Sequence, residues 1–169
     1  LAQIASMGDF HYLIHKDSDE TKTRTFVNLL STEERKIKIL KLLELAKEIN
    51  LKNNPQISNF EILELCSSLK KLVLSYNDLH GKIINFYELT NLTNLDLSNN
   101  TLWSEDLENL KVLKNNTNLT INLENNSIIN ATALLELNPS TKIKLKGNVN
   151  LSQDSKDKLK ARFGNNVTF

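Results

Sequence analysis

The chain has 169 residues, of which 40% are hydrophobic, so it has the length of one domain and enough apolar side chains to bury a core. Its formal net charge of +1 argues against strong attraction of the whole molecule to nucleic acid or to an anionic membrane. The sequence contains no apolar run of about 18 residues, the length that a transmembrane helix requires. Residues 1–8 lack the basic and apolar segments of a signal peptide.

Cysteine and asparagine usage indicates the compartment. Cys66 is the only cysteine, so no intrachain disulfide can form. Three of the eight N-x-S/T sequences fall on or beside predicted strands (Asn99, Asn125 and Asn166), where a glycan would block a sheet. The other five begin at Asn91, Asn115, Asn118, Asn130 and Asn150. We therefore predict a reducing intracellular environment, in which these sequences stay unmodified.

Residues 1–31 are predicted to form a separate N-terminal cap. Two β-rich stretches, Phe10–His15 and Thr25–Leu30, flank the polar stretch Lys16–Lys22, which favours a hairpin. His11 and His15 lie four residues apart and share a face, but no third ligand accompanies them, whereas zinc sites use three or four. Solvated strand histidines are the better interpretation, and we predict no bound metal.

A helix is predicted from Thr32 to Lys47. Ser31-Thr32-Glu33-Glu34 has the form of a capping box at its start. Its apolar face is predicted to comprise Ile37, Leu40, Leu43, Leu45 and Ile49.

After this helix, one sequence motif repeats, with the pattern L-x-x-L-x-L-x-x-N-x-L. The clearest copies are Leu69–Leu79 and Leu92–Leu102, and looser copies centre on Ile49, Ile121 and Ile143. The first strand position thus recurs at 49, 72, 95, 121 and 143, with spacings of 23, 23, 26 and 22 residues. This spacing predicts an α/β solenoid of five to six repeats over residues 32–169, with a curved parallel sheet on the concave side and helices on the convex side.

Within each repeat, alternation along the strand turns the leucines inward and the residue between them outward. The asparagine that follows is predicted to turn inward, where its amide can satisfy backbone groups of its own turn and of the next repeat. Asn54, Asn77, Asn100, Asn126 and Asn148 should therefore form a buried ladder.

The convex segments are predicted to carry apolar stripes. Ser104–Leu113 is expected to be helical and to bury Leu107, Leu110 and Leu113. One repeat earlier, the same role falls to Phe60, Ile62, Leu63, Leu65, Cys66 and Leu69, so Cys66 is interpreted as a core residue and not as a nucleophile.

At the C-terminal end, Leu151–Phe163 is predicted to be a capping helix that ends at Gly164. Val167-x-Phe169 then matches Ile143-x-Leu145 at a spacing of 24, which predicts a sixth strand.

The outward strand positions are the candidate binding residues. Their centre is neutral to acidic, with Asp96 and Glu124, and their C-terminal end is a row of three lysines, for which a solubilising terminal strand is the alternative explanation. Trp103 either packs on the neighbouring turn or is an exposed anchor. The full predicted protein-binding set is Lys52, Val73, Ser75, Tyr76, Asp96, Ser98, Asn99, Trp103, Asn122, Glu124, Lys142, Lys144 and Lys146.

The repeats and the asparagine series resemble leucine-rich-repeat proteins, and the closing segment Leu151–Val167 looks like the ribonuclease-inhibitor-like subclass with regular convex helices. The cysteine-poor, Asn/Lys-rich style is similar to that of leucine-rich-repeat effectors of intracellular bacteria. This resemblance implies a non-enzymatic protein-interaction module that inhibits or regulates a partner enzyme, in the host or among co-delivered effectors. It also implies secretion from a bacterium into the host cytosol.

We predict no cofactor, no catalytic residue, no nucleic acid or membrane partner, and a monomer apart from its protein partner. Two alternatives stay open. The chain is the substrate-recognition part of a larger enzyme such as a ubiquitin ligase, or it is a weakly basic nucleic-acid binder that uses Lys142, Lys144, Lys146 and the helix Lys156–Arg162.

Overall fold

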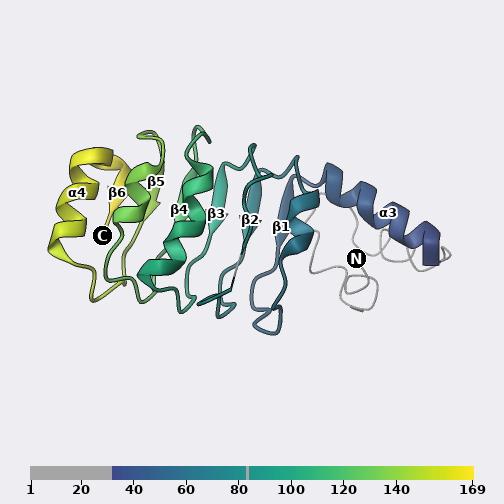
Figure 1. Ribbon diagram of the computed structural model, residues 1–169, viewed down its shortest axis with the longest axis horizontal. Coiled ribbons are helices and arrows are strands. Elements are labelled where there is room, and N and C mark those ends of the chain that lie inside the picture. The colour runs from purple at the N-terminus through teal and green to yellow at the C-terminus, as the bar shows by residue number, and fades with distance from the viewer. Residues whose placement is uncertain (1–31, 83) are drawn as a thin grey trace.

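The repeated leucines place one short strand of each repeat beside the next. A computed structural model describes residues 32–82 and 84–169 of the chain. In these ranges the strands form one six-stranded parallel sheet in chain order, β1 to β6 (Figure 1). The strands are β1 (Glu48–Asn50), β2 (Lys71–Val73), β3 (Asn94–Asp96), β4 (Thr120–Asn122), β5 (Lys142–Lys144) and β6 (Val167–Thr168). The predicted leucine-rich-repeat solenoid is therefore confirmed.

The strand register follows the repeat exactly as the sequence spacing requires. Ile49 pairs with Leu72, Leu72 with Leu95, and Leu95 with Ile121. Ile121 then pairs with Ile143, which pairs with Val167, so the predicted sixth strand is present. All six side chains are buried, because parallel strands in register place equivalent residues on the same face.

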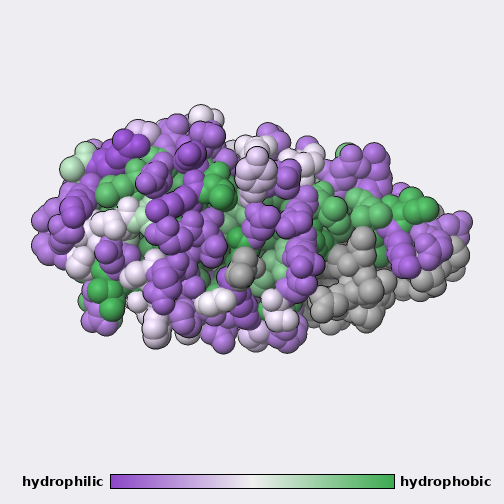
Figure 2. Space-filling view, in the orientation of Figure 1, coloured by the Kyte–Doolittle hydropathy of each residue, from purple (hydrophilic) through white to green (hydrophobic). Residues whose placement is uncertain are grey.

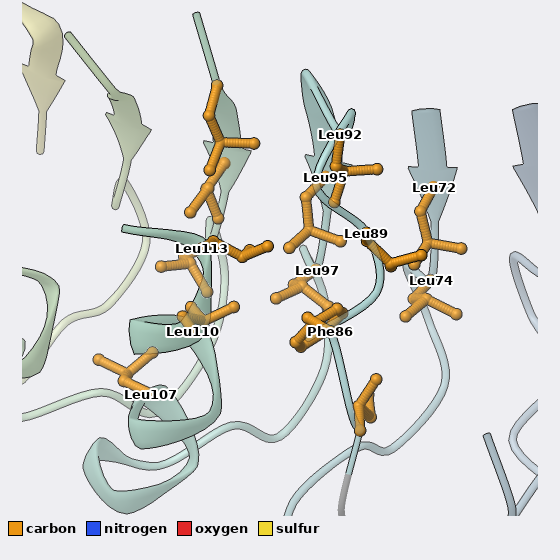
Figure 3. Packing of buried hydrophobic residues seen from close by; sticks show 14 of the residues in the cluster. Leu72, Leu74, Phe86, Leu89, Leu92, Leu95, Leu97, Leu107, Leu110 and Leu113 are labelled. Atoms are coloured by element: carbon orange, nitrogen blue, oxygen red, sulfur yellow. The ribbon is translucent and has the colours of Figure 1, made fainter. Parts of the chain in front are cut away.

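The core lies between the sheet and the convex segments. Figure 3 shows leucines from two neighbouring strands, among them Leu72 and Leu95, packed with Phe86 and with Leu107 of the convex side. Each buried leucine contributes roughly 1.5–3 kcal/mol relative to an exposed one. Since every repeat adds such a layer, neighbouring repeats stabilise one another along the whole stack.

The convex segments between strands are 3₁₀ helices, and not the regular helices that the resemblance to the ribonuclease-inhibitor-like subclass implies. They are η2 (Glu61–Leu65), η3 (Ser104–Leu113) and η4 (Thr132–Glu136), and the described residues between β2 and β3 form turns. A 3₁₀ helix rises about 2.0 Å per residue against about 1.5 Å in an α-helix. A repeat of 22 to 26 residues can thus cross the convex side with fewer residues. The predicted stripe Leu107, Leu110 and Leu113 is buried, whereas Leu65 of η2 is 38% exposed.

The N-terminal helix α3 (Thr32–Leu45) ends two residues before the predicted boundary. Ile39 and Leu43 are buried, whereas Ile37 is 67% and Leu45 is 55% exposed, which corrects the predicted apolar face. Residues four apart share a helical face, while residues two apart point to nearly opposite sides. Hydrophobic groups accordingly gather over α3 in Figure 2. Residues 1–31, with the predicted hairpin and with His11 and His15, lie outside the described residues.

The C-terminal helix α4 (Gln153–Phe163) is the predicted capping helix. Its N-cap Ser152 accepts the N–H of Ser155 at 3.2 Å, and it ends at Gly164. A single 3₁₀ turn, η5 (Gly164–Asn166), then leads into β6. Figure 1 shows α3 and α4 at opposite ends of the row of strands.

Candidate binding surface

The predicted asparagine ladder is present in the turns that follow the strands, beside the candidate binding surface. Asn54, Asn77, Asn100, Asn126 and Asn148 are all buried. The amide of Asn100 donates to the carbonyl oxygens of Leu74 and Leu97 at 3.0 Å, and its Oδ1 accepts the N–H of Asn77 at 2.7 Å. Both amide donations recur at Asn77, Asn126 and Asn148, although Oδ1 of Asn148 accepts the N–H of Ile128 and not that of Asn126. The strand ends are thereby fixed, and so are the side chains that leave the sheet there.

The outward side chains of the strands form one surface, which we call the concave face. Lys52, Tyr76, Lys142, Lys144 and Lys146 are exposed on it. The predicted residues Val73, Asp96, Asn99, Asn122 and Glu124 are partly buried there.

Two predicted binding residues, Ser75 and Ser98, are buried, which corrects their assignment to this face. The strands end at Val73 and Asp96, two residues before each serine, so the alternation along the strand no longer determines where the serines point. The Ser98 hydroxyl donates to Asp96 Oδ1 at 2.7 Å and its N–H donates to the same oxygen at 3.0 Å. The two serines therefore belong to the turn after the strand.

Some polar residues of the concave face also shape that turn. Oδ1 of Asn50 accepts the N–H of Lys52 at 3.0 Å, and Oδ1 of Asn122 accepts the N–H of Glu124 at 2.9 Å. Asp96 makes the equivalent bond to Ser98. Side chains of Asn and Asp make such local turns readily. Asp96 and Asn122 thus have a structural role that the outward alternation alone did not indicate.

At the N-terminal end of the concave face, Lys52 and Tyr76 form a pair between adjacent repeats. The Lys52 Nζ lies 5.3 Å from the centre of the Tyr76 ring, within the range of a cation–π contact. Tyr76 is 50% exposed. A positive charge and a phenol are therefore presented together.

At the other end, Lys142, Lys144 and Lys146 project side by side. None of the three is in an ion pair among residues 32–82 and 84–169. β6 pairs with β5, so Lys142 and Lys144 lie on an interior strand and not on the last described strand of the sheet, and Lys146 follows two residues after β5 ends. Protection of a terminal strand, the alternative explanation, does not fit this position.

Trp103 lies on the rim where the chain leaves β3. Its ring stacks on His80 of the preceding repeat, with centroids 4.3 Å apart and planes at 22°, yet it stays 50% exposed. It therefore packs on the neighbouring turn and still offers half its surface. Asp106 of η3, which is not among the predicted binding residues, organises this cluster. Its carboxylate accepts the N–H groups of Trp103 at 2.7 Å and of Gly81 at 2.9 Å.

His80 shares this carboxylate, since its Nδ1 lies 2.9 Å from Asp106 Oδ2. That hydrogen bond is the main reason why the pKa of His80 is raised above its ordinary value, and the charges of Asp106, Glu105 and Asp78 add to it, against a smaller opposing effect of desolvation.

Ser104 begins η3, and its hydroxyl accepts the N–H groups of Ile129 and Asn130 from the next repeat, at 3.2 and 2.9 Å. It therefore links adjacent repeats.

Groups for catalysis or metal binding are sparse in the part of the chain that the structure describes. Cys66 is buried, and burial raises its thiol pKa to about 12, so the reactive thiolate is disfavoured. Its role as a core residue is confirmed. The described residues contain no group of three or more His, Cys, Asp or Glu side chains arranged for a metal ion. No helix in those residues is long and apolar enough for a membrane span.

Of three comparisons with known proteins, the one with solved structures found matches. No family model matches the sequence, and no curated protein matches it. Among solved structures, internalin C2 of Listeria monocytogenes is similar, with 21% sequence identity and a TM-score of 0.47. The alignment covers 79% of this chain and 74% of that one.

Proposed function

We propose that this protein is a non-enzymatic interaction module that binds a protein partner through its concave face. The supporting observation is the series of outward side chains on the sheet. Lys52 and Tyr76 lie at one end, and partly buried Asp96 and Glu124 lie at the centre. At the other end are Lys142, Lys144 and Lys146, which form no ion pair with another described residue. Complementary charge patterns of this kind determine partner choice and orientation more than they determine raw affinity.

The proposed partner is an enzyme that the module inhibits or regulates by covering it, in the manner of a bacterial effector acting in the host cytosol. A reducing compartment suits the single buried Cys66. It also suits Asn99 and Asn125, whose glycosylation would place sugars beside the concave face. We propose that the protein is a monomer apart from this partner and uses no cofactor.

Nucleic acid is a weaker candidate partner, because the second group of basic residues is partly engaged within the protein. Lys158 of α4 pairs with Asp154 at 2.7 Å, and Arg162 donates to the carbonyl of Leu137 at 3.1 Å. Because of these contacts, the three lysines of the concave face and the basic residues of α4 do not form one continuous basic surface for a phosphate backbone.

The test is affinity capture from lysates of the source organism and of a candidate host. The variant Lys142→Glu/Lys144→Glu/Lys146→Glu is compared with the wild type and with Lys114→Glu/Lys156→Glu/Lys160→Glu. The control variant changes the net charge equally, but its lysines follow η3 or lie on α4, away from the concave face. A protein captured by wild type and control but not by the concave variant supports the proposal. Equal capture by all three would exclude the lysine end of the face as the binding site. Loss of nucleic acid from both variants would favour the basic alternative.

A further inference from the structure

The residue before each ladder asparagine has a left-handed backbone. The φ angles are 61° at Asn53, 62° at Tyr76, 53° at Asn99, 56° at Asn125 and 82° at Gly147. Asn and Gly are the residue types that adopt this conformation most readily. Four of the five repeats use them, whereas the second repeat uses a bulky tyrosine, for which such a φ is an outlier.

Nothing in the fold of the described residues explains why tyrosine stands at this position. Its ring is half exposed, so it is not part of the core. Its N–H donates to the carbonyl of Ser98 at 3.3 Å, a backbone bond that Asn53, Asn99 and Asn125 also make to the following repeat. The exposed cation–π contact with Lys52 stabilises the folded state only weakly. Backbone conformations that oppose stability are concentrated at functional sites.

We infer that Tyr76 is the anchor of the concave-face interface and that, with Lys52, it binds a carboxylate side chain bordered by apolar surface on the partner. This inference rests on the proposed function. The phenol O–H and the Lys52 ammonium are both hydrogen-bond donors on the same side of the molecule. No ion pair within the described residues includes Lys52, so its charge is available to a partner. Val73, partly buried in the same repeat, supplies apolar surface nearby in the chain. Tyrosine is also one of the residue types that most often dominate interface energies.

The first experiment measures what Tyr76 does to folding. Replacing Tyr76 by Asn should raise the melting temperature by about 2–4 °C, because Asn tolerates the left-handed backbone. The matched variant Asn99→Tyr places tyrosine at the same position of the next repeat and should lower it by a similar amount. A lower melting temperature for Tyr76→Asn would mean that tyrosine supports the fold, and would overturn the inference.

The second experiment measures binding with a displayed random-peptide library selected on the wild-type protein. Selected peptides should be enriched in Asp or Glu next to an apolar residue. They should bind the Tyr76→Asn variant about 30-fold more weakly and the Lys52→Gln variant about 10-fold more weakly. Asn99→Tyr should not gain affinity for them.

The outcomes separate this inference from the proposed function. One outcome is that selected peptides bind Tyr76→Asn as well as they bind wild type, yet fail to bind the Lys142→Glu/Lys144→Glu/Lys146→Glu variant. That result would overturn the role of Tyr76 and would still support binding through the concave face. Peptides insensitive to both sets of substitutions, or the failure to select any peptide, would count against the concave-face function itself and against this inference with it.

Discussion

Asn77 and Asn100 are joined across two repeats: the backbone N–H of Asn77 donates to Oδ1 of Asn100 at 2.7 Å, and the Asn100 amide donates back to the carbonyl of Leu74. Both residues are buried, so water does not replace these bonds. The relationship connects the side-chain type at one position of the repeat to the backbone of the preceding repeat. It makes the ladder a determinant of repeat stacking and not only of local turns.

Replacing Asn100 by Ala should therefore destabilise the protein by about 2–4 kcal/mol, since it leaves the buried N–H of Asn77 without its acceptor and removes one of the two amide donors to each of the Leu74 and Leu97 carbonyls. Urea unfolding followed by circular dichroism measures this. The exposed Asn115 is the control, and Asn115→Ala should change the free energy of unfolding by less than about 0.5 kcal/mol. Equal effects of the two substitutions would show that the ladder does not stabilise the stack.

Much of the fold can be predicted from the sequence, because each copy of the motif independently predicts the same strand and the same asparagine position. The register from Ile49 to Val167 and the five ladder asparagines follow from spacing alone. The helix type on the convex side does not follow, since 22 to 26 residues can be spanned in more than one way. The burial of Ser75 and Ser98 was missed because alternation holds only within a strand, and these strands are three residues long.

The candidate site was less predictable. The exposed lysines of β5 follow from alternation, but the cluster of His80, Trp103 and Asp106 joins residues up to 26 positions apart. The one sequence signal for the contact of His80 with Trp103 is that they lie 23 residues apart, which is the spacing of the repeat. Tyrosine as a residue type does not predict a left-handed φ. The conformation of Tyr76 is recognised only when the equivalent residues of the five turns are compared.

Thr141 should be a position where a substitution stabilises the protein. Its side chain is buried, and its hydroxyl has no hydrogen-bond partner among the described residues. Thr141→Val keeps the shape and removes the unsatisfied group, so the free energy of unfolding should rise by about 1 kcal/mol. Thr141→Ser is the matched control, because it keeps the hydroxyl and loses a buried methyl group, and it should lower stability by about 1 kcal/mol. A valine variant less stable than wild type would contradict this prediction.

His80 should make stability depend on pH. Its folded-state pKa is raised above the ordinary value of 6.5, chiefly by the hydrogen bond to Asp106. The stabilisation from its protonated form is thus fully present below about pH 6.5 and is lost as the pH rises through the folded-state pKa. The melting temperature of wild type should exceed that of His80→Gln at pH 6, and the difference should shrink towards pH 9.

Proton NMR of the His80 ring gives its pKa directly. Asp106→Asn should lower that pKa, because it removes the carboxylate that favours the charged imidazole. Trp103, the only tryptophan, contacts the ring, so its fluorescence provides a second readout of the same titration. A difference between wild type and His80→Gln that is independent of pH would show that the stacking, and not the charge, is what His80 contributes.

Gly147 should tolerate a side chain less well than Gly81, although both have a positive φ, at 82° and 70°. A Cβ at Gly147 would overlap Oδ1 of Asn125 and lie 3.1 Å from its backbone nitrogen, whereas one at Gly81 would meet nothing within 4 Å. Gly81→Ala should therefore lower the free energy of unfolding by about 1 kcal/mol, the cost of a left-handed backbone at alanine. Gly147→Ala should cost about 2–3 kcal/mol, because the turn before the Asn148 rung has to shift as well. Asn125→Ala alone has its own cost, because Asn125 also has a left-handed φ of 56°. Relative to that single variant, adding Gly147→Ala should cost only the left-handed backbone at alanine, since the overlapping amide is gone. If the larger cost of Gly147→Ala persists there, the close approach of the Asn125 backbone is its cause, and not the Asn125 side chain.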